Sequence, residues 1–187
     1  MIIITGLRSG TALIMQTCEL LGKEVVGYKF HDEFSHQELN PKGYYFLSQN
    51  EIRDGLNTTE YKGKCVKLGG GHLAKTDPKY IDKVIYCKRN PNEVKKSMLK
   101  LLKADYDMIG LEPTGENAEK AYDANLLLTI PYLKDNNIPT LIVYYEDMIL
   151  NPVKTINLVK DFLDVDTSIE LALLNVDKRS VSCLQPQ

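Results

Sequence analysis

Basic and hydroxyl side chains lie close to the N-terminus, between an apolar run and a stretch of good helix formers. Residues 6–11 are Gly-Leu-Arg-Ser-Gly-Thr, and they follow the uncharged run of residues 1–5. The isoleucines of that run predict a buried strand, and the apolar spacing of residues 10–22 predicts a helix. A strand–turn–helix unit directs backbone N–H groups and the positive end of a helix dipole at one point, where Arg8 adds a fixed charge. The segment is therefore a candidate phosphate-binding loop.

The loop differs from the one that binds nucleoside triphosphates. That motif places four residues between its two glycines and a lysine directly after the second glycine. Here three residues separate Gly6 from Gly10, and Thr11 stands in place of the lysine. The spacing argues against an ordinary kinase or NTPase, and it leaves a small-substrate kinase with an atypical loop as an alternative. A plain strand-to-helix turn with a solvated Arg8 is the simplest other interpretation.

A second strand-to-helix junction carries another basic residue. The apolar run of residues 84–87 leads into Lys-Arg-Asn-Pro, in which Asn-Pro is a helix-start signal. Arg89 lies at the predicted strand end and Ser97 about two helical turns further on, so that together they could hold a second anion. The carboxyl ends of parallel strands share one edge of a sheet. The sequence therefore predicts two anion sites close to each other.

The ordered motifs resemble those of sulfotransferases that use 3′-phosphoadenosine 5′-phosphosulfate (PAPS). Residues 8–12, Arg-Ser-Gly-Thr-Ala, are similar to the family's 5′-phosphosulfate loop, and residues 89–97 are similar to its 3′-phosphate motif. Residues 144–148, Tyr-Tyr-Glu-Asp-Met, resemble the family's Tyr-Glu-Asp strand end. Residues 40–45 resemble a segment of small bacterial sulfotransferases.

The chain also departs from the family's pattern. Ala12 stands where a second threonine is usual, and Phe46 stands where relatives often carry a glutamate. Residues 99–137 match no motif of the family. We expect the acceptor pocket to be built from residues 30–60 and 99–137, so the acceptor's identity and the oligomeric state stay open.

The resemblance implies that PAPS is the sulfuryl donor, with a hydroxyl or amine of a small molecule or carbohydrate as acceptor. No metal is expected, because a sulfuryl group carries less negative charge than a phosphoryl group. Arg8 would also stabilise charge on the leaving phosphate. A nucleotide-binding protein without catalysis remains an alternative. The residues implied to hold the nucleotide are Arg8, Ser9, Gly10, Thr11, Ala12, Arg89, Ser97, Tyr145, Lys178 and Arg179.

The catalytic base stays open between His72, the cluster of residues 31–36, and neither of them. Lys67 matches a lysine that cytosolic relatives carry, and His72 follows it at a looser spacing. Between them, residues 69–71 are three glycines, which indicate either a flexible turn or a close backbone approach to a ligand. Relatives that sulfate tyrosine hold a catalytic glutamate after the second strand, where this chain has the cluster His31, Asp32, Glu33 and His36.

Length, charge and cysteine spacing narrow the class of protein. We expect the 187 residues to form a single domain, 1–187. Lys plus Arg total 23 and Asp plus Glu total 25, and a net charge of −2 offers no electrostatic case for binding nucleic acid or a membrane surface. No run approaches the roughly 20 apolar residues of a membrane-spanning helix, and no signal peptide is evident. The four cysteines lack metal or redox spacing, which favours a cytoplasmic protein with reduced thiols.

Strand and helix patterns alternate along the chain. They predict a three-layer α/β fold, a mainly parallel sheet with helices on both faces, and the resemblance implies a P-loop-like sulfotransferase fold. The predicted strands are residues 1–5, 24–28, 64–68, 83–88 and 139–145. The predicted helices are residues 10–22, 48–56, 90–104, 116–135, 152–163 and 167–175.

Overall fold

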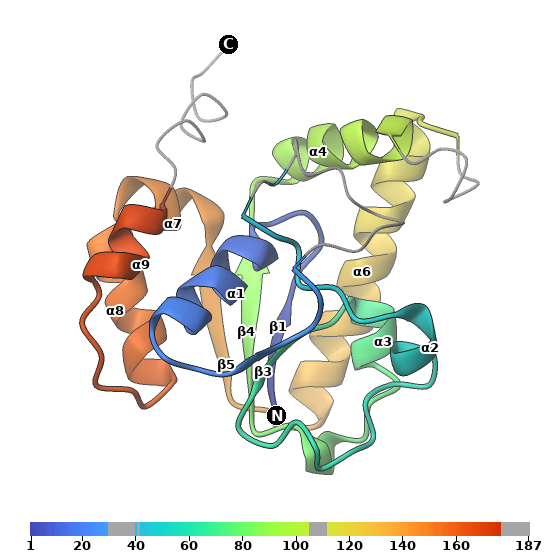
Figure 1. The fold of residues 1–187 in the computed structure, drawn as a ribbon. Helices are drawn as coiled ribbons and strands as arrows, with labels where there is room; N and C mark the ends of the chain where they lie inside the picture. Colours follow the sequence, from blue (N-terminus) through green and yellow to red (C-terminus); the bar gives the residue numbers. More distant parts are fainter. Residues whose placement is uncertain (30–39, 41, 105–111, 177–187) are drawn as a thin grey trace.

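A five-stranded parallel sheet forms the centre of the computed structural model, which describes residues 1–29, 40, 42–104 and 112–176. The strand order is β2-β3-β1-β4-β5, and every pair of neighbours is parallel (Figure 1). All residues of the central strand β1 are buried, as the run of β-branched side chains predicts. The strands are β1 (Ile2–Thr5), β2 (Val25–Val26), β3 (Cys65–Lys67), β4 (Lys83–Lys88) and β5 (Thr140–Tyr144).

Helices cover both faces of the sheet. One face carries α1, α7, α8 and α9, the other carries α2, α3 and α6, and α4 lies at the carboxyl end of the strands (Figure 1). Within the described residues, no helix combines the length and the apolar character needed to cross a bilayer. The helices are α1 (Thr11–Leu20), α2 (Gln49–Ile52), α3 (Gly70–Leu73), α4 (Pro91–Ala104), α6 (Gly115–Asp135), α7 (Tyr145–Leu150), α8 (Pro152–Phe162) and α9 (Glu170–Asn175), and η1 (Pro78–Tyr80) is a short 3₁₀ turn.

The core is divided between the two faces because side chains alternate along a strand. Ile4 of β1 packs with Met15 of α1 and Ile156 of α8, and all three are fully buried. Ile3 points the other way and packs with Leu73 of α3 and Leu133 of α6. The predicted three-layer α/β architecture is confirmed.

Element boundaries differ from the prediction where tertiary contacts override local pattern. Strand β2 is shorter than residues 24–28, because Tyr28 pairs with Phe46 in an isolated antiparallel bridge. The glycines of residues 69–71 do not form a flexible turn. They enter the one-turn helix α3, where a Cβ on Gly70 would lie 2.4 Å from Thr129 Oγ1, so the close approach is to α6.

Candidate anion-binding site at the carboxyl edge of the sheet

The segment between β1 and α1 is held against β4 by a side-chain hydrogen bond. The hydroxyl of Ser9, which is 4% exposed, donates to the carbonyl of Cys87 at 2.7 Å. That hydroxyl therefore anchors the loop, and a role for Ser9 in holding a ligand stays a prediction. Thr11 and Ala12 begin α1 directly afterwards, so their backbone N–H groups lie in its first turn.

Arg8 joins the two predicted anion motifs. Its backbone is left-handed, with φ of 50°, which is uncommon for a residue other than glycine. Its Nε donates to Oγ of Ser97 on α4 at 3.1 Å. The sequence predicted that the two junctions share one sheet edge, and in the structure their side chains touch.

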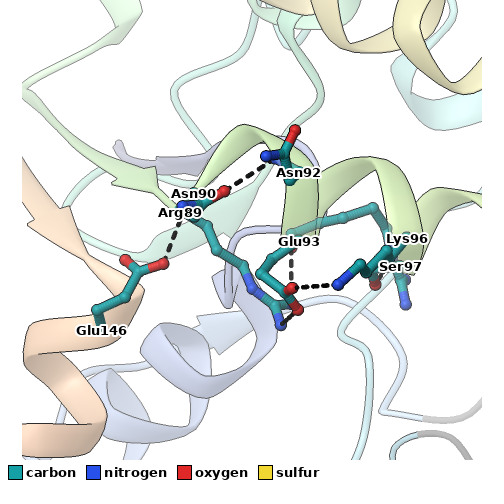
Figure 2. A network of polar contacts seen from close by, with 8 residues as sticks. Arg89, Asn90, Asn92, Glu93, Lys96, Ser97 and Glu146 are labelled. Atoms are coloured by element: carbon teal, nitrogen blue, oxygen red, sulfur yellow. Dashed lines mark hydrogen bonds and ion pairs between the residues drawn. The ribbon is translucent and has the colours of Figure 1, made fainter. Parts of the chain in front are cut away.

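Arg89 lies at the end of β4 in a partly satisfied setting (Figure 2). Its Nη1 donates to the carbonyl of Arg8 at 3.4 Å, and its Nη2 lies 3.7 Å from Oε2 of Glu93. Its guanidinium lies 4.4 Å from the ring centroid of Tyr145, in a cation–π contact. Nε is buried and has no hydrogen-bond partner within the described part of the chain. A buried donor of a charged group that has no partner among the described residues is a candidate contact for an anion.

Carboxylates tie the start of α4 to its surroundings. The backbone N–H of Asn90 donates to Oε1 of Glu146 at 2.9 Å, which links α4 to the first turn of α7 (Figure 2). The side chain of Asn90 accepts from the N–H of Asn92 at 2.9 Å. Glu93 also accepts from Lys96 at 3.1 Å, so it moderates the positive charge next to Arg89.

Tyr145 packs between the loop and Arg89. Gly10 precedes α1 with φ of 88°, and a Cβ at this position would lie 2.6 Å from Cδ2 of Tyr145. Only glycine meets both conditions without strain. Tyr145 was predicted near the nucleotide, and its ring lies beside both arginine-bearing segments.

Lys67, at the end of β3, has an enclosed side chain. Its Nζ makes a short hydrogen bond to the carbonyl of Tyr44 and lies 3.9 Å from the ring centroid of Phe46. The rings of Tyr44 and Phe46 are stacked, with centroids 5.3 Å apart. Burial, and next the positive charge of Arg8, lower the pKa of Lys67 to about 7. Sequence reasoning missed this enclosure, because the residues that form it come from a distant segment.

The other candidates for the catalytic base are placed differently. His72 lies on α3, and partial burial followed by the charge of Lys75 lowers its pKa, which favours the neutral imidazole. His31 and Glu33, together with Lys178 and Arg179, lie outside the described residues. Among the described residues, no group of three or more His, Cys, Asp or Glu is placed to hold a metal ion.

A cavity of about 10 Å³ lies beside the loop, which is room for about one water molecule. Helix α6 contributes Tyr122 and Asn125 to its wall, although residues 99–137 carried no motif that the sequence could assign. The cavity is lined by Leu7, Ser9, Tyr86, Cys87, Lys88, Arg89, Val94, Tyr122 and Asn125.

The fold is similar to that of mouse sulfotransferase SULT7A1 complexed with PAP. The match has a TM-score of 0.57 at 16% sequence identity, and it covers 96% of this chain and 63% of the mouse chain. No family model matches the sequence. No curated protein matches it either. The chain therefore has a sulfotransferase-like fold, and at this identity the likeness concerns the fold alone.

Gly10→Ala tests the packing of Tyr145 on the loop. We expect it to lower the free energy of unfolding by about 1–3 kcal/mol more than Gly63→Ala, because overlap with the ring adds to the strain of a positive φ. Gly63 is the matched control, since its φ is 73° and no atom lies within 4 Å of a Cβ built there. Urea denaturation measures both losses. In a protein that already carries Tyr145→Ala, Gly10→Ala should lower the free energy of unfolding by no more than Gly63→Ala does. Equal losses for Gly10→Ala and Gly63→Ala in the wild-type background would contradict the packing argument.

Proposed function

We propose that this protein is a sulfotransferase that moves a sulfuryl group from PAPS to a hydroxyl or amine of a small-molecule or carbohydrate acceptor. The observation that carries the proposal is the contact between two arginine-bearing junctions at one sheet edge, Arg8 to Ser97 at 3.1 Å. Beside it lies the buried Nε of Arg89, which has no hydrogen-bond partner among the described residues. The sulfotransferase-like fold supports it, and the neighbour was crystallised with PAP. The chain spans 63% of that neighbour, so its activity and substrates are part of the proposal.

The residues present fit a nucleotide with two separated anionic groups. Arg8 and the start of α1, residues 9–12, offer a fixed charge and backbone N–H donors for a 5′-phosphosulfate. Arg89 and Ser97 offer an unpaired N–H and a hydroxyl for a 3′-phosphate. Tyr145 presents a ring between the two groups. Lys178 and Arg179 are proposed as further contacts to the 3′-phosphate.

Binding requires local rearrangement. Arg8 and Ser97 serve different phosphates in the proposal, so their mutual hydrogen bond opens when the nucleotide enters. Glu93 holds Arg89 loosely, at 3.7 Å, and a phosphate oxygen is the stronger partner for a guanidinium.

The chemistry at the site follows from charge. When bound, PAPS supplies an activated sulfuryl group and a phosphate leaving group. Arg8 and the N–H groups of residues 9–12 stabilise negative charge that develops on the phosphate, without a metal. A base must accept the acceptor's proton, and the candidates are His72, His31 and Glu33.

Adenosine 3′,5′-bisphosphate (PAP) should bind without a divalent metal, because the two arginines supply the charge that magnesium supplies to triphosphates. Isothermal calorimetry with EDTA and with magnesium measures this, with ATP plus magnesium as the comparison ligand. Preference for ATP with magnesium would favour a kinase of small substrates. PAP binding without sulfate transfer, across a screen of phenols, sugars and amines with labelled PAPS, would favour a nucleotide-binding protein without catalysis.

Arg89→Ala should make the free energy of PAP binding less favourable by about 1.5–3 kcal/mol, the scale of a hydrogen bond to a charged group. It should barely change binding of adenosine 5′-phosphosulfate, which has no 3′-phosphate. Lys95→Ala is the control, because it also removes one positive charge, here from the neighbouring helix α4, where Lys95 pairs with Glu119. Calorimetry with both ligands separates the cases. An equal loss for both ligands would assign Arg89 to holding the loop through the carbonyl of Arg8.

Arg8→Ala should lower the rate of sulfuryl transfer by about 10²–10³-fold, because it removes a donor to developing negative charge. This factor should exceed the loss of affinity for PAPS. Arg8→Lys should recover part of the rate, because a point charge serves without the forked geometry of a guanidinium. Single-turnover rates at saturating PAPS, with an acceptor from the screen, measure this. An unchanged rate in Arg8→Ala would remove Arg8 from the mechanism.

A further inference from the structure

We propose that Lys67 is a proton-coupled part of the anion site: its side chain is a neutral amine in the free protein and becomes an ammonium when an anionic ligand enters beside Arg8. The ligand's identity rests on the proposed function, whereas the state of the free amine rests on the packing around Lys67 alone.

The surroundings of Lys67 offer an ammonium too few partners. Lysine has three N–H donors to satisfy, and within the described residues Nζ has one hydrogen-bond acceptor, the carbonyl of Tyr44. Its other close contacts are aromatic, with the ring centroid of Phe46 at 3.9 Å and that of Tyr44 at 5.9 Å. No carboxylate pairs with it in the described part of the chain. The rings offer an ammonium cation–π contacts, but two of its three N–H donors would lack an acceptor among the described residues, so burial disfavours the charged form.

The charges on neighbouring elements act in the same direction. Lys67 shares a sheet face with Cys65, which packs against α1. Among the described residues, the carboxylate of Glu19 on that side is already engaged, because it pairs with Lys29 at 2.8 Å and accepts from the hydroxyl of Tyr45 at 2.7 Å. Among the described residues, the charged or titratable groups on the elements around this face include Arg8 in the loop, Cys18 and Glu19 on α1, Cys65 on β3, Lys29 after β2, Tyr44 and Tyr45 near Lys67, and His72 on α3.

An anion bound at the loop favours the charged form of Lys67 over the neutral form. In the free protein, burial and then the charge of Arg8 hold the pKa of Lys67 at about 7. A ligand that carries negative charge offsets the field of Arg8 and attracts an ammonium, so it raises the pKa of Lys67. Between the free and the bound pKa, binding takes up a proton. The contribution of Lys67 to affinity is therefore constant below about pH 6, and it falls by up to about tenfold per pH unit above pH 7.

Calorimetry of PAP binding in buffers of different ionisation enthalpy measures the proton uptake. At pH 8.0 about nine-tenths of a group with a pKa of about 7 is neutral, and at pH 6.0 about one-tenth. The uptake of the wild type should therefore exceed that of Lys67→Met by close to one proton at pH 8.0 and by about 0.1 at pH 6.0. Subtracting the proton uptake measured for Lys67→Met removes the contribution of the ligand's own phosphates. Equal uptake in the two proteins at pH 8.0 would overturn the proposal.

Two further variants serve as controls for the measured proton uptake. Lys67→Arg carries a permanent charge, so it should bind PAP without the additional proton even where Lys67→Met is poorly folded. Lys79→Met is the matched control, because Lys79 lies on η1 and pairs with Asp77, away from the loop. This variant should take up as many protons on binding as the wild type. Loss of uptake in Lys79→Met as well would show that the proton goes elsewhere and would overturn the role of Lys67.

Lysine side-chain NMR separates this inference from the proposed function. In the free protein, the Lys67 signal, assigned by its absence in Lys67→Met, should titrate near pH 7. Inorganic sulfate, which keeps its two charges throughout this pH range, should move that midpoint upward. A midpoint near the ordinary lysine value, or one that sulfate leaves unchanged, would overturn the inference even if PAP binds. Failure of PAP to bind, with a sulfate-dependent midpoint, would instead overturn the proposed nucleotide and support the proton-coupled anion site.

Discussion

Parallel pairing of β1 with β4 is the constraint on which the rest of the site depends. Its register places Ile4 opposite Ile85 and Thr5 opposite Tyr86, so β1 ends opposite Tyr86 while β4 continues to Lys88. The loop that follows β1 therefore lies against the end of β4, where the hydroxyl of Ser9 reaches a β4 carbonyl. Pairing a central strand with both neighbours in one direction collects chain segments that are about 80 residues apart in sequence at one edge of the sheet.

The cost of this arrangement is a concentration of positive charge. Arg8, Arg89 and Lys67 lie at the same edge, and the contacts between them and their neighbours are mostly with neutral groups: a serine hydroxyl, backbone carbonyls and aromatic rings. Glu93 is the carboxylate near Arg89, and it lies at a long 3.7 Å. An anionic ligand would relieve repulsion among the three cations, satisfy the unpaired Nε of Arg89 and restore the charge of Lys67.

Strand and helix positions were largely predictable, because they depend on local patterns of apolar residues. The isoleucines of β1 and the apolar run of β4 are buried as expected, and Pro91 begins α4 as expected. The misses have non-local causes. Helix α3 forms at three glycines because it packs on α6, and β2 ends early because Tyr28 pairs with Phe46. Propensity does not register contacts of this kind, which form only when distant elements meet.

The sequence by itself determined the class of fold, the order of the motifs and the two arginines at strand ends, because strand period, turn chemistry and fixed charge are properties of neighbouring residues. Only the tertiary structure decided how these groups are used. It engaged the hydroxyl of Ser9 in holding the loop, joined Arg8 to Ser97, and enclosed Lys67 with Tyr44 and Phe46. The physical reason is that hydrogen-bond partners and proton affinity depend on which distant segments exclude water from a group, and only the folded chain brings those segments together.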